Sequence, residues 1–154
     1  MREADKLGAS VLLGDRDARE TLARLRDALA EVLSTPGALD NLAPPPQELV
    51  DAMGATNDKS AELSRENVLS TMAALKQREN VRLLSSYLQE NVPPFYRALI
   101  SERDRYMAKS LLGCPGERIV AVVGLAHVDG IEKILTAEAS TARVAARPSA
   151  CQLY

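Results

Sequence analysis

Apolar residues recur at helical spacing over most of the chain, and at two places they form continuous runs. The first helical stripe consists of Leu22, Leu25, Leu29 and Val32. This spacing of three or four residues predicts a helix over residues 17–33. Asp17 and Glu20 stand three residues apart at its start, an arrangement typical of an N-terminal capping box.

Four further helices are predicted from apolar spacing and from helix-ending residues. They cover residues 2–7, ending at Gly8; 47–53; 59–90, with a break near 77–80; and 95–112, preceded by Pro93-Pro94 and followed by Gly113. Glycine and proline mark these boundaries because glycine caps helix C-termini and proline is tolerated in a first turn. A last helix is expected from Asp129 to about Ala139, and residues 140–154 are expected to form a weakly structured tail.

The two continuous apolar runs predict β-strands. Residues 10–13 and 119–123 are apolar almost throughout and end in glycine. A strand that is apolar on both faces is typical of a parallel sheet covered by helices. We therefore expect an α/β fold that is rich in helices and contains a small parallel sheet. Because two strands rarely form a stable sheet alone, we expect the sheet to be incomplete in this chain. The alternative is a small helical protein with a two-stranded ribbon.

Candidate chemistry lies where the two predicted strands end. Asp15 follows the first strand, and His127, the only histidine, follows the second. Ligands of open α/β sheets bind outside the carboxyl ends of the strands, so we expect these side chains to share one edge. An imidazole there suits acid–base chemistry or metal binding. The structural alternative is that His127 and Asp15 only satisfy backbone groups of their own turns.

Glu102 and Arg103 form a second candidate site on the helix predicted over residues 95–112. Helical spacing places Arg103 in a stripe with Tyr96, Ile100 and Met107. A charged side chain that faces a core needs a partner, for which Asp15 and Glu102 are available. The functional interpretation is an arginine that orients a carboxylate or binds an anion. The alternative is an arginine that extends its charged end to solvent while its stem packs.

Charge and composition exclude several classes of function. The formal net charge is −2 with both signs interspersed, which argues against a dedicated nucleic-acid-binding protein. No continuous apolar run is long enough to cross a membrane. Neither cysteine belongs to a Cys-x-x-Cys motif, so we expect a reduced, intracellular environment.

Three segments together resemble the TraB family. Residues 101–108, Ser-Glu-Arg-Asp-Arg-Tyr-Met-Ala, resemble the family's Glu-Arg-Asp helix. Residues 118–131, Arg-Ile-Val-Ala-Val-Val-Gly-Leu-Ala-His-Val-Asp-Gly-Ile, resemble its strand with a Gly-x-x-His turn. Residues 11–16, Val-Leu-Leu-Gly-Asp-Arg, resemble a third family segment. Ala126 and Asp129 depart from the glycine and proline that are usual at these positions.

The resemblance implies an α/β domain over residues 1–139 that lacks the family's N-terminal motif. The family includes bacterial pheromone-shutdown proteins, eukaryotic TraB-domain proteins and, more distantly, the Tiki proteins. The Tiki branch suggests metal-dependent peptide hydrolysis, with His127 as a ligand of a divalent metal ion or as an acid–base group. Glu102, Asp15 and Arg103 would then complete the catalytic set. With one Gly-x-x-His motif, this segment alone is expected to be inactive.

Two functions remain open at this point. The first is a binding or regulatory domain that recognises a peptide or protein partner at an organelle membrane, in a mitochondrion or plastid, and reaches the membrane through segments outside this chain. The second is a metal-dependent, peptidase-like hydrolase. The substrate and the oligomeric state do not follow from the sequence.

Overall fold

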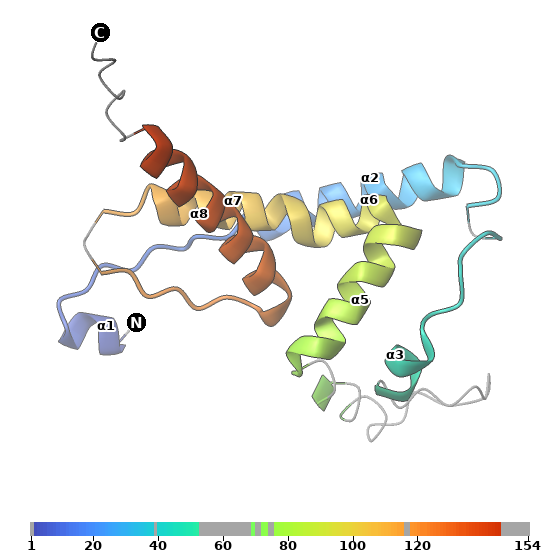
Figure 1. The fold of residues 1–154 in the computed structure, drawn as a ribbon, viewed down its shortest axis with the longest axis horizontal. Helices are drawn as coiled ribbons and strands as arrows, with labels where there is room; N and C mark the ends of the chain where they lie inside the picture. Colours follow the sequence, from blue (N-terminus) through green and yellow to red (C-terminus); the bar gives the residue numbers. More distant parts are fainter. Residues whose placement is uncertain are drawn as a thin grey trace, which may run out of the picture.

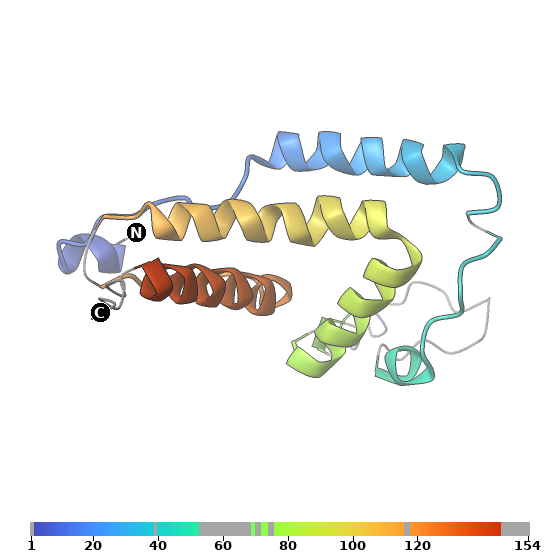
Figure 2. The same cartoon turned by 45° about the horizontal axis from the view of Figure 1, so that its top comes forward.

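The computed structural model describes residues 2–38, 40–52, 69, 72–73, 76–115 and 118–145. The helices in this part of the chain are α1 (Arg2–Lys6), α2 (Ala18–Ser34), α3 (Gln47–Ala52), α5 (Arg78–Asn91), α6 (Pro93–Tyr96), the π-helix η1 (Arg97–Ser101), α7 (Glu102–Leu112) and α8 (Leu125–Ala145). Helix α2 lies along α6 and η1, and α8 packs against α7 (Figures 1 and 2). Helix α5 leaves α6 at a steep angle and contacts α8.

Local sequence explains where several of these helices begin and end. The Asp17 carboxylate accepts a hydrogen bond of 2.6 Å from the backbone N–H of Arg19, which caps α2. Gly8 follows α1 with a φ of 62°, a left-handed conformation that glycine adopts without strain. Pro93 and Pro94 occupy the first turn of α6, where a missing N–H has no cost. The helices predicted over residues 2–7, 17–33 and 47–53 are therefore confirmed with small shifts of their ends.

The helix predicted over residues 95–112 is also confirmed, but it contains a π-helical turn. Helices α6, η1 and α7 follow one another without interruption, and the backbone N–H of Glu102 bonds to the carbonyl of Arg97 five residues earlier. Single π-helical turns often occur at functional sites. The spacing of apolar residues did not predict this turn. A π-helical turn contains one residue more than an α-helical turn, which shifts the apolar stripe of the helix without interrupting it.

The predicted α/β fold with a small parallel sheet is wrong: the described part of the chain is helical. No described residue forms a β-strand. Residues 10–14 and 118–124, here called the first and second extended segments, run as drawn-out chain (Figure 1). Among the described residues, the backbone groups of residues 10–14 and 118–123 form no hydrogen bond with another backbone group, and the carbonyl of Gly124 accepts only from the N–H of His127 in the first turn of α8. A strand needs a neighbouring backbone to pair its N–H and C=O groups, and a continuous apolar run does not supply one.

Two expectations for the C-terminal half also need correction. Helix α8 begins at Leu125, one turn earlier than the predicted start, so Asp129 lies inside the helix and does not cap it. The same helix continues to Ala145, beyond the predicted end near residue 139. The break expected near residues 77–80 is where α5 begins. Residues 59–68 of the helix predicted there lie outside the described residues.

The core lies between α7 and α8 and depends on one glycine. Met107, Ala108 and Ile131 form its buried centre. A Cβ atom added to Gly130 would lie 2.0 Å from Oδ2 of Asp104 and 3.2 Å from its Cβ. Gly130 therefore lets α8 approach the buried side chain of Asp104 closely.

Replacing Gly130 by alanine is expected to destabilise the protein. Overpacking of a core costs about 1–3 kcal/mol, more than the roughly 1 kcal/mol that alanine gains over glycine inside a helix. The matched control is Gly113→Ala, because a Cβ there would meet no atom closer than 3.5 Å. Urea denaturation followed by circular dichroism measures both variants. Equal free energies of unfolding for Gly130→Ala and the wild type would contradict the close approach.

Candidate functional site

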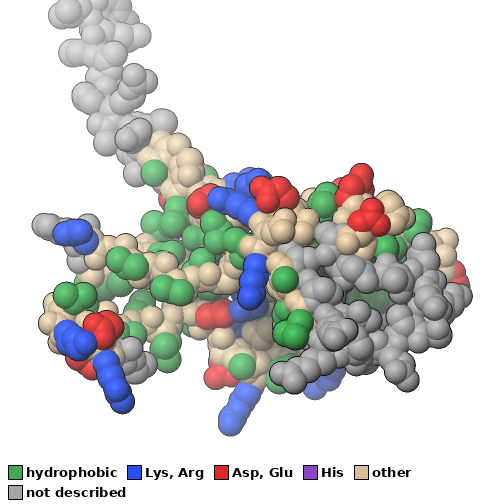
Figure 3. All heavy atoms as spheres, turned by 90° about the horizontal axis from the view of Figure 1, so that it is seen from below, with side chains coloured by type: hydrophobic (Ala, Val, Ile, Leu, Met, Phe, Trp, Pro, Cys, Tyr) green, Lys and Arg blue, Asp and Glu red, His purple; other side chains and the backbone are tan. Residues whose placement is uncertain are grey.

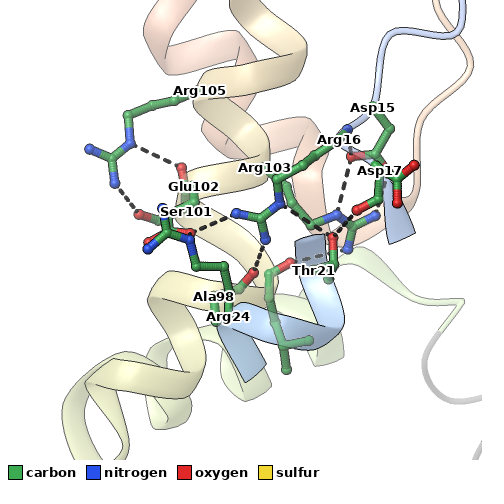
Figure 4. Close-up of polar contacts among 11 residues, drawn as sticks. Asp15, Arg16, Asp17, Thr21, Arg24, Ala98, Ser101, Glu102, Arg103 and Arg105 are labelled. Atoms are coloured by element: carbon green, nitrogen blue, oxygen red, sulfur yellow. Dashed lines mark hydrogen bonds and ion pairs between the residues drawn. The ribbon is translucent and has the colours of Figure 1, made fainter. Parts of the chain in front are cut away.

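The buried guanidinium of Arg16 connects the first extended segment to η1 and α7. Arg16 is 7% exposed. Its Nη1 donates to Oε2 of Glu102 at 2.7 Å, and its Nη2 donates to the carbonyl of Ala98 at 2.9 Å (Figure 4). Its Nε lies 3.3 Å from Oγ1 of Thr21 on α2. Because a buried charge without partners is very costly, these contacts fix how the three elements meet.

Arg103 and Asp15 form a second ion pair beside the first. The Nε and Nη2 atoms of Arg103 donate to the two carboxylate oxygens of Asp15 at 3.2 and 2.7 Å (Figure 4). The hydrogen bonds from Arg103 hold the pKa of Asp15 below its usual range, helped by the backbone N–H of Arg16 and opposed by burial. The bonds from Asp15 raise the pKa of Arg103. Both groups are therefore charged at neutral pH.

The π-helical turn supplies carbonyl groups to three arginines. The carbonyl of Ala98 accepts from Arg16, that of Leu99 accepts from Nη1 of Arg103 at 3.1 Å, and that of Ser101 accepts from Nε of Arg105 at 3.2 Å. The π-helical residues thus help to place the ion pairs Arg16–Glu102 and Arg103–Asp15 at the start of α7.

Asp104 and His127 form a buried pair between α7 and α8. The two residues are 4% and 5% exposed, and Nδ1 of His127 lies 2.6 Å from Oδ1 of Asp104. Which atom donates in this contact depends on the tautomer of the imidazole, and Nε2 is the ring nitrogen that the contact leaves unused. His127 lies in the first turn of α8, where its backbone N–H bonds to the carbonyl of Gly124 at 2.9 Å. Burial raises the pKa of Tyr96, and the negative charge of Asp104 adds to this shift.

The structure brings some of the predicted site residues together and separates others. Asp15 contacts Arg103, one of the expected pairings, whereas Glu102 pairs with Arg16. His127 forms no hydrogen bond with Glu102 or Arg103, and it lies close enough to Asp15 to be the smallest of the causes that lower the pKa of that carboxyl. Of the four residues, Asp15 and Arg103 are the two that hydrogen bonds join to each other.

Arg16, Asp104 and Gly130 were not predicted as members of the site. For Asp104 a signal existed: it lies four residues after Ile100 and three before Met107, so it shares their helical face. Helical spacing alone placed Arg103, one position away, on that face. For Arg16 and Gly130 we find no sequence signal beyond their place in the matched segments.

The residues that the structure describes do not fit a complete metal site. Within these residues no three histidine, cysteine, aspartate or glutamate side chains gather closely enough to hold a metal ion. Asp15 and Glu102 are each neutralised by an arginine, and Nδ1 of His127 is occupied by Asp104. The arrangement can therefore hold neighbouring segments of the chain in fixed positions and orient the imidazole of His127. It supports no metal-dependent reaction step.

Comparison with known proteins gives one family match and one relative. A family model described as the TraB/PrgY/gumN family matches residues 1–140. The chain is 32% identical over 136 residues to the uncharacterized protein MJ1365 of Methanocaldococcus jannaschii, a match that covers 86% of this chain and 29% of that protein. The chain thus spans less than a third of that relative's length. No solved structure matches.

Replacing Arg16 by methionine is expected to destabilise the fold by about 2–3 kcal/mol, because it leaves Glu102 and the Ala98 carbonyl without their donor. Arg105→Gln is the control, since Arg105 is exposed and its side chain bonds, among the described residues, only to Ser101 of the preceding turn. A surface change of this kind alters stability by less than about 0.5 kcal/mol. Urea denaturation gives the free energy of unfolding of both variants. If both lose the same free energy of unfolding relative to the wild type, the buried contacts of Arg16 contribute no more than an exposed contact does.

Asp15 is expected to contribute stability that disappears in acid. Its folded pKa lies below the unfolded value, so the contribution is complete above about pH 4 and is lost as the pH falls through the folded pKa. The Asp15 side chain is 43% exposed, so solvent screening limits the contribution to below about 1 kcal/mol. The free energies of unfolding of Asp15→Asn and of the wild type should therefore differ most near neutral pH and become equal in acid. A difference that grows on acidification would contradict the pairing.

Proposed function

Because the chain belongs to the TraB/PrgY/gumN family, we propose that it is a protein-binding domain whose charged motif residues hold a peptide-binding surface in place. The observation that carries this proposal is the exposure of the second extended segment, in which Val120 and Val122 are 93% and 97% exposed. Exposed apolar patches on soluble proteins often mark sites of interaction with other proteins.

The second extended segment offers two kinds of contact to a peptide. Val120 and Val122 are two residues apart, so in extended chain their side chains lie on the same side, while Val123 packs against the core. Within the described residues, the backbone N–H and C=O groups of residues 118–123 make no hydrogen bond. Such a segment suits a partner peptide in extended conformation, which supplies backbone hydrogen bonds and apolar side chains at alternate positions.

The first extended segment adds apolar surface of the same kind. Val11, Leu12 and Leu13 are all exposed. Apolar side chains also appear at the surface on the face drawn in Figure 3, away from the grey atoms. Arg16 and Asp15 fasten the end of this segment to α7, and His127 fastens the start of α8 to the same helix. The charged pairs therefore support the surface and leave recognition to the apolar residues.

The metal-dependent hydrolase is the less favoured function. Its support is the buried Asp104–His127 pair, since a carboxylate that orients a histidine recurs in metal and acid–base sites. Against it, the carboxylates of Asp15 and Glu102 are paired with arginines. The location at an organelle membrane stays a prediction from the family resemblance. None of the helices that the structure describes combines the length and apolar character that crossing a membrane requires.

Replacing both Val120 and Val122 by aspartate is expected to weaken peptide binding by at least about tenfold, because each buried valine contributes about 1.5 kcal/mol or more. The ligands are peptides selected from a phage-displayed random library on the immobilised wild-type chain, and fluorescence polarisation measures their affinities. The control is Leu29→Asp, which changes an exposed leucine on α2. The proposal fails if no peptide is enriched, or if the selected peptides bind the double variant and the wild type equally.

A further inference from the structure

A cavity of about 180 Å³ is lined by residues of α5, α6, η1, α7 and α8. Its charged lining consists of Arg78 and Arg82 from α5, Asp104 from α7 and Asp129 from α8. Val81, Ile100 and Leu125 provide apolar lining. The cavity is distinct from the extended segments and contains none of the residues of the Arg16 and Arg103 ion pairs.

One carboxylate oxygen of Asp104 is available to a ligand. Oδ1 is bonded to His127, whereas Oδ2 has no hydrogen-bond partner among the described residues. Within that part of the chain, no side-chain oxygen or nitrogen is both sealed from solvent and without a partner. Oδ2 is therefore reached by solvent although Asp104 is nine-tenths buried. Oδ2 also lies next to Gly130, which lines the cavity and has no side chain to cover it.

The two arginines keep hydrogen-bond donors free at another wall of the cavity. Arg78 and Arg82 bind Asp129 through their Nε and Nη2 atoms, with Nε distances of 2.8 and 2.5 Å. Nη2 of Arg78 also bonds to Glu132 at 2.9 Å. These bonds leave Nη1 of both arginines without an acceptor in the described residues. The bonds from Arg82 and Arg78 lower the pKa of Asp129 to about 2, so this carboxylate is ionised at neutral pH.

We propose that this cavity binds a small zwitterion, a free L-α-amino acid with an apolar side chain. The ammonium group donates to Oδ2 of Asp104, and the carboxylate accepts from the Nη1 groups of Arg78 and Arg82. The side chain packs against the apolar lining. The cavity has two positive and two negative lining residues, so a ligand of zero net charge leaves no charge unpaired.

The size of the cavity limits the ligand. An apolar cavity of about 150 Å³ holds a benzene molecule. The volume here therefore matches a molecule of about the size of valine. The inference stands independently of the peptide-binding surface, because no residue of that surface lines the cavity.

The test is a nuclear magnetic resonance titration of the full 154-residue chain with L-valine as the probe. We expect saturable shifts of the backbone amides of Ser85, Gln89 and Gly130, which line the cavity. Isobutylamine and isobutyrate, which carry only the ammonium or only the carboxylate, should each bind at least about tenfold more weakly, because a hydrogen bond to a charged group is lost. Arg82→Gln should weaken valine binding by a similar factor.

Arg97→Gln is the matched control, because Arg97 forms a comparable exposed ion pair with Glu31 outside the cavity. Its valine affinity should equal that of the wild type. Each variant's spectrum before titration shows that it is folded. The proposal is overturned if valine causes no saturable shifts at the cavity amides, if isobutyrate binds as tightly as valine, or if Arg82→Gln retains wild-type affinity.

Discussion

The guanidinium of Arg16 is a buried charge, and the arrangement of the surrounding elements follows from the need to pair it. Two of its partners, the carboxylate of Glu102 and the carbonyl of Ala98, lie 86 and 82 residues away along the chain. A buried arginine tolerates few geometries, because losing one partner leaves a costly unpaired group. The first extended segment must therefore end where η1 gives way to α7, in one register.

The neighbouring charged pairs meet the same helix turn. Arg103 holds Asp15, and Asp104 holds His127 at the start of α8. Consecutive residues of α7 thus bind the end of the first extended segment and the start of α8. In each of the three pairs, the two side chains come from different segments of the chain. The paired residues therefore act as structural connections between these segments. The surfaces left for recognition are the exposed valines of the second extended segment and the cavity beside Asp104.

The sequence predicted the helices well and the environment of the apolar runs poorly. Helical spacing and end residues were sufficient for α2 and for the helix through residues 95–112, and charge complementarity named Asp15 as a partner of Arg103. The sheet failed because apolar character does not show whether a second backbone lies alongside. Asp104 was missed because adjacent helix positions differ by about 100° around the axis, so a stripe drawn through Arg103 and one drawn through Asp104 both include Ile100 and Met107. The close approach at Gly130 depends on where two helices meet, which spacing within one helix does not determine.

The most direct test of the account is a double-mutant cycle on Arg16 and Glu102. The free energy of unfolding is measured by urea denaturation for Arg16→Met, Glu102→Gln, the double variant and the wild type. If the buried pair holds the first extended segment to α7, the two changes are coupled by about 1–3 kcal/mol. If their effects add within about 0.5 kcal/mol, the two side chains act independently and the account is contradicted.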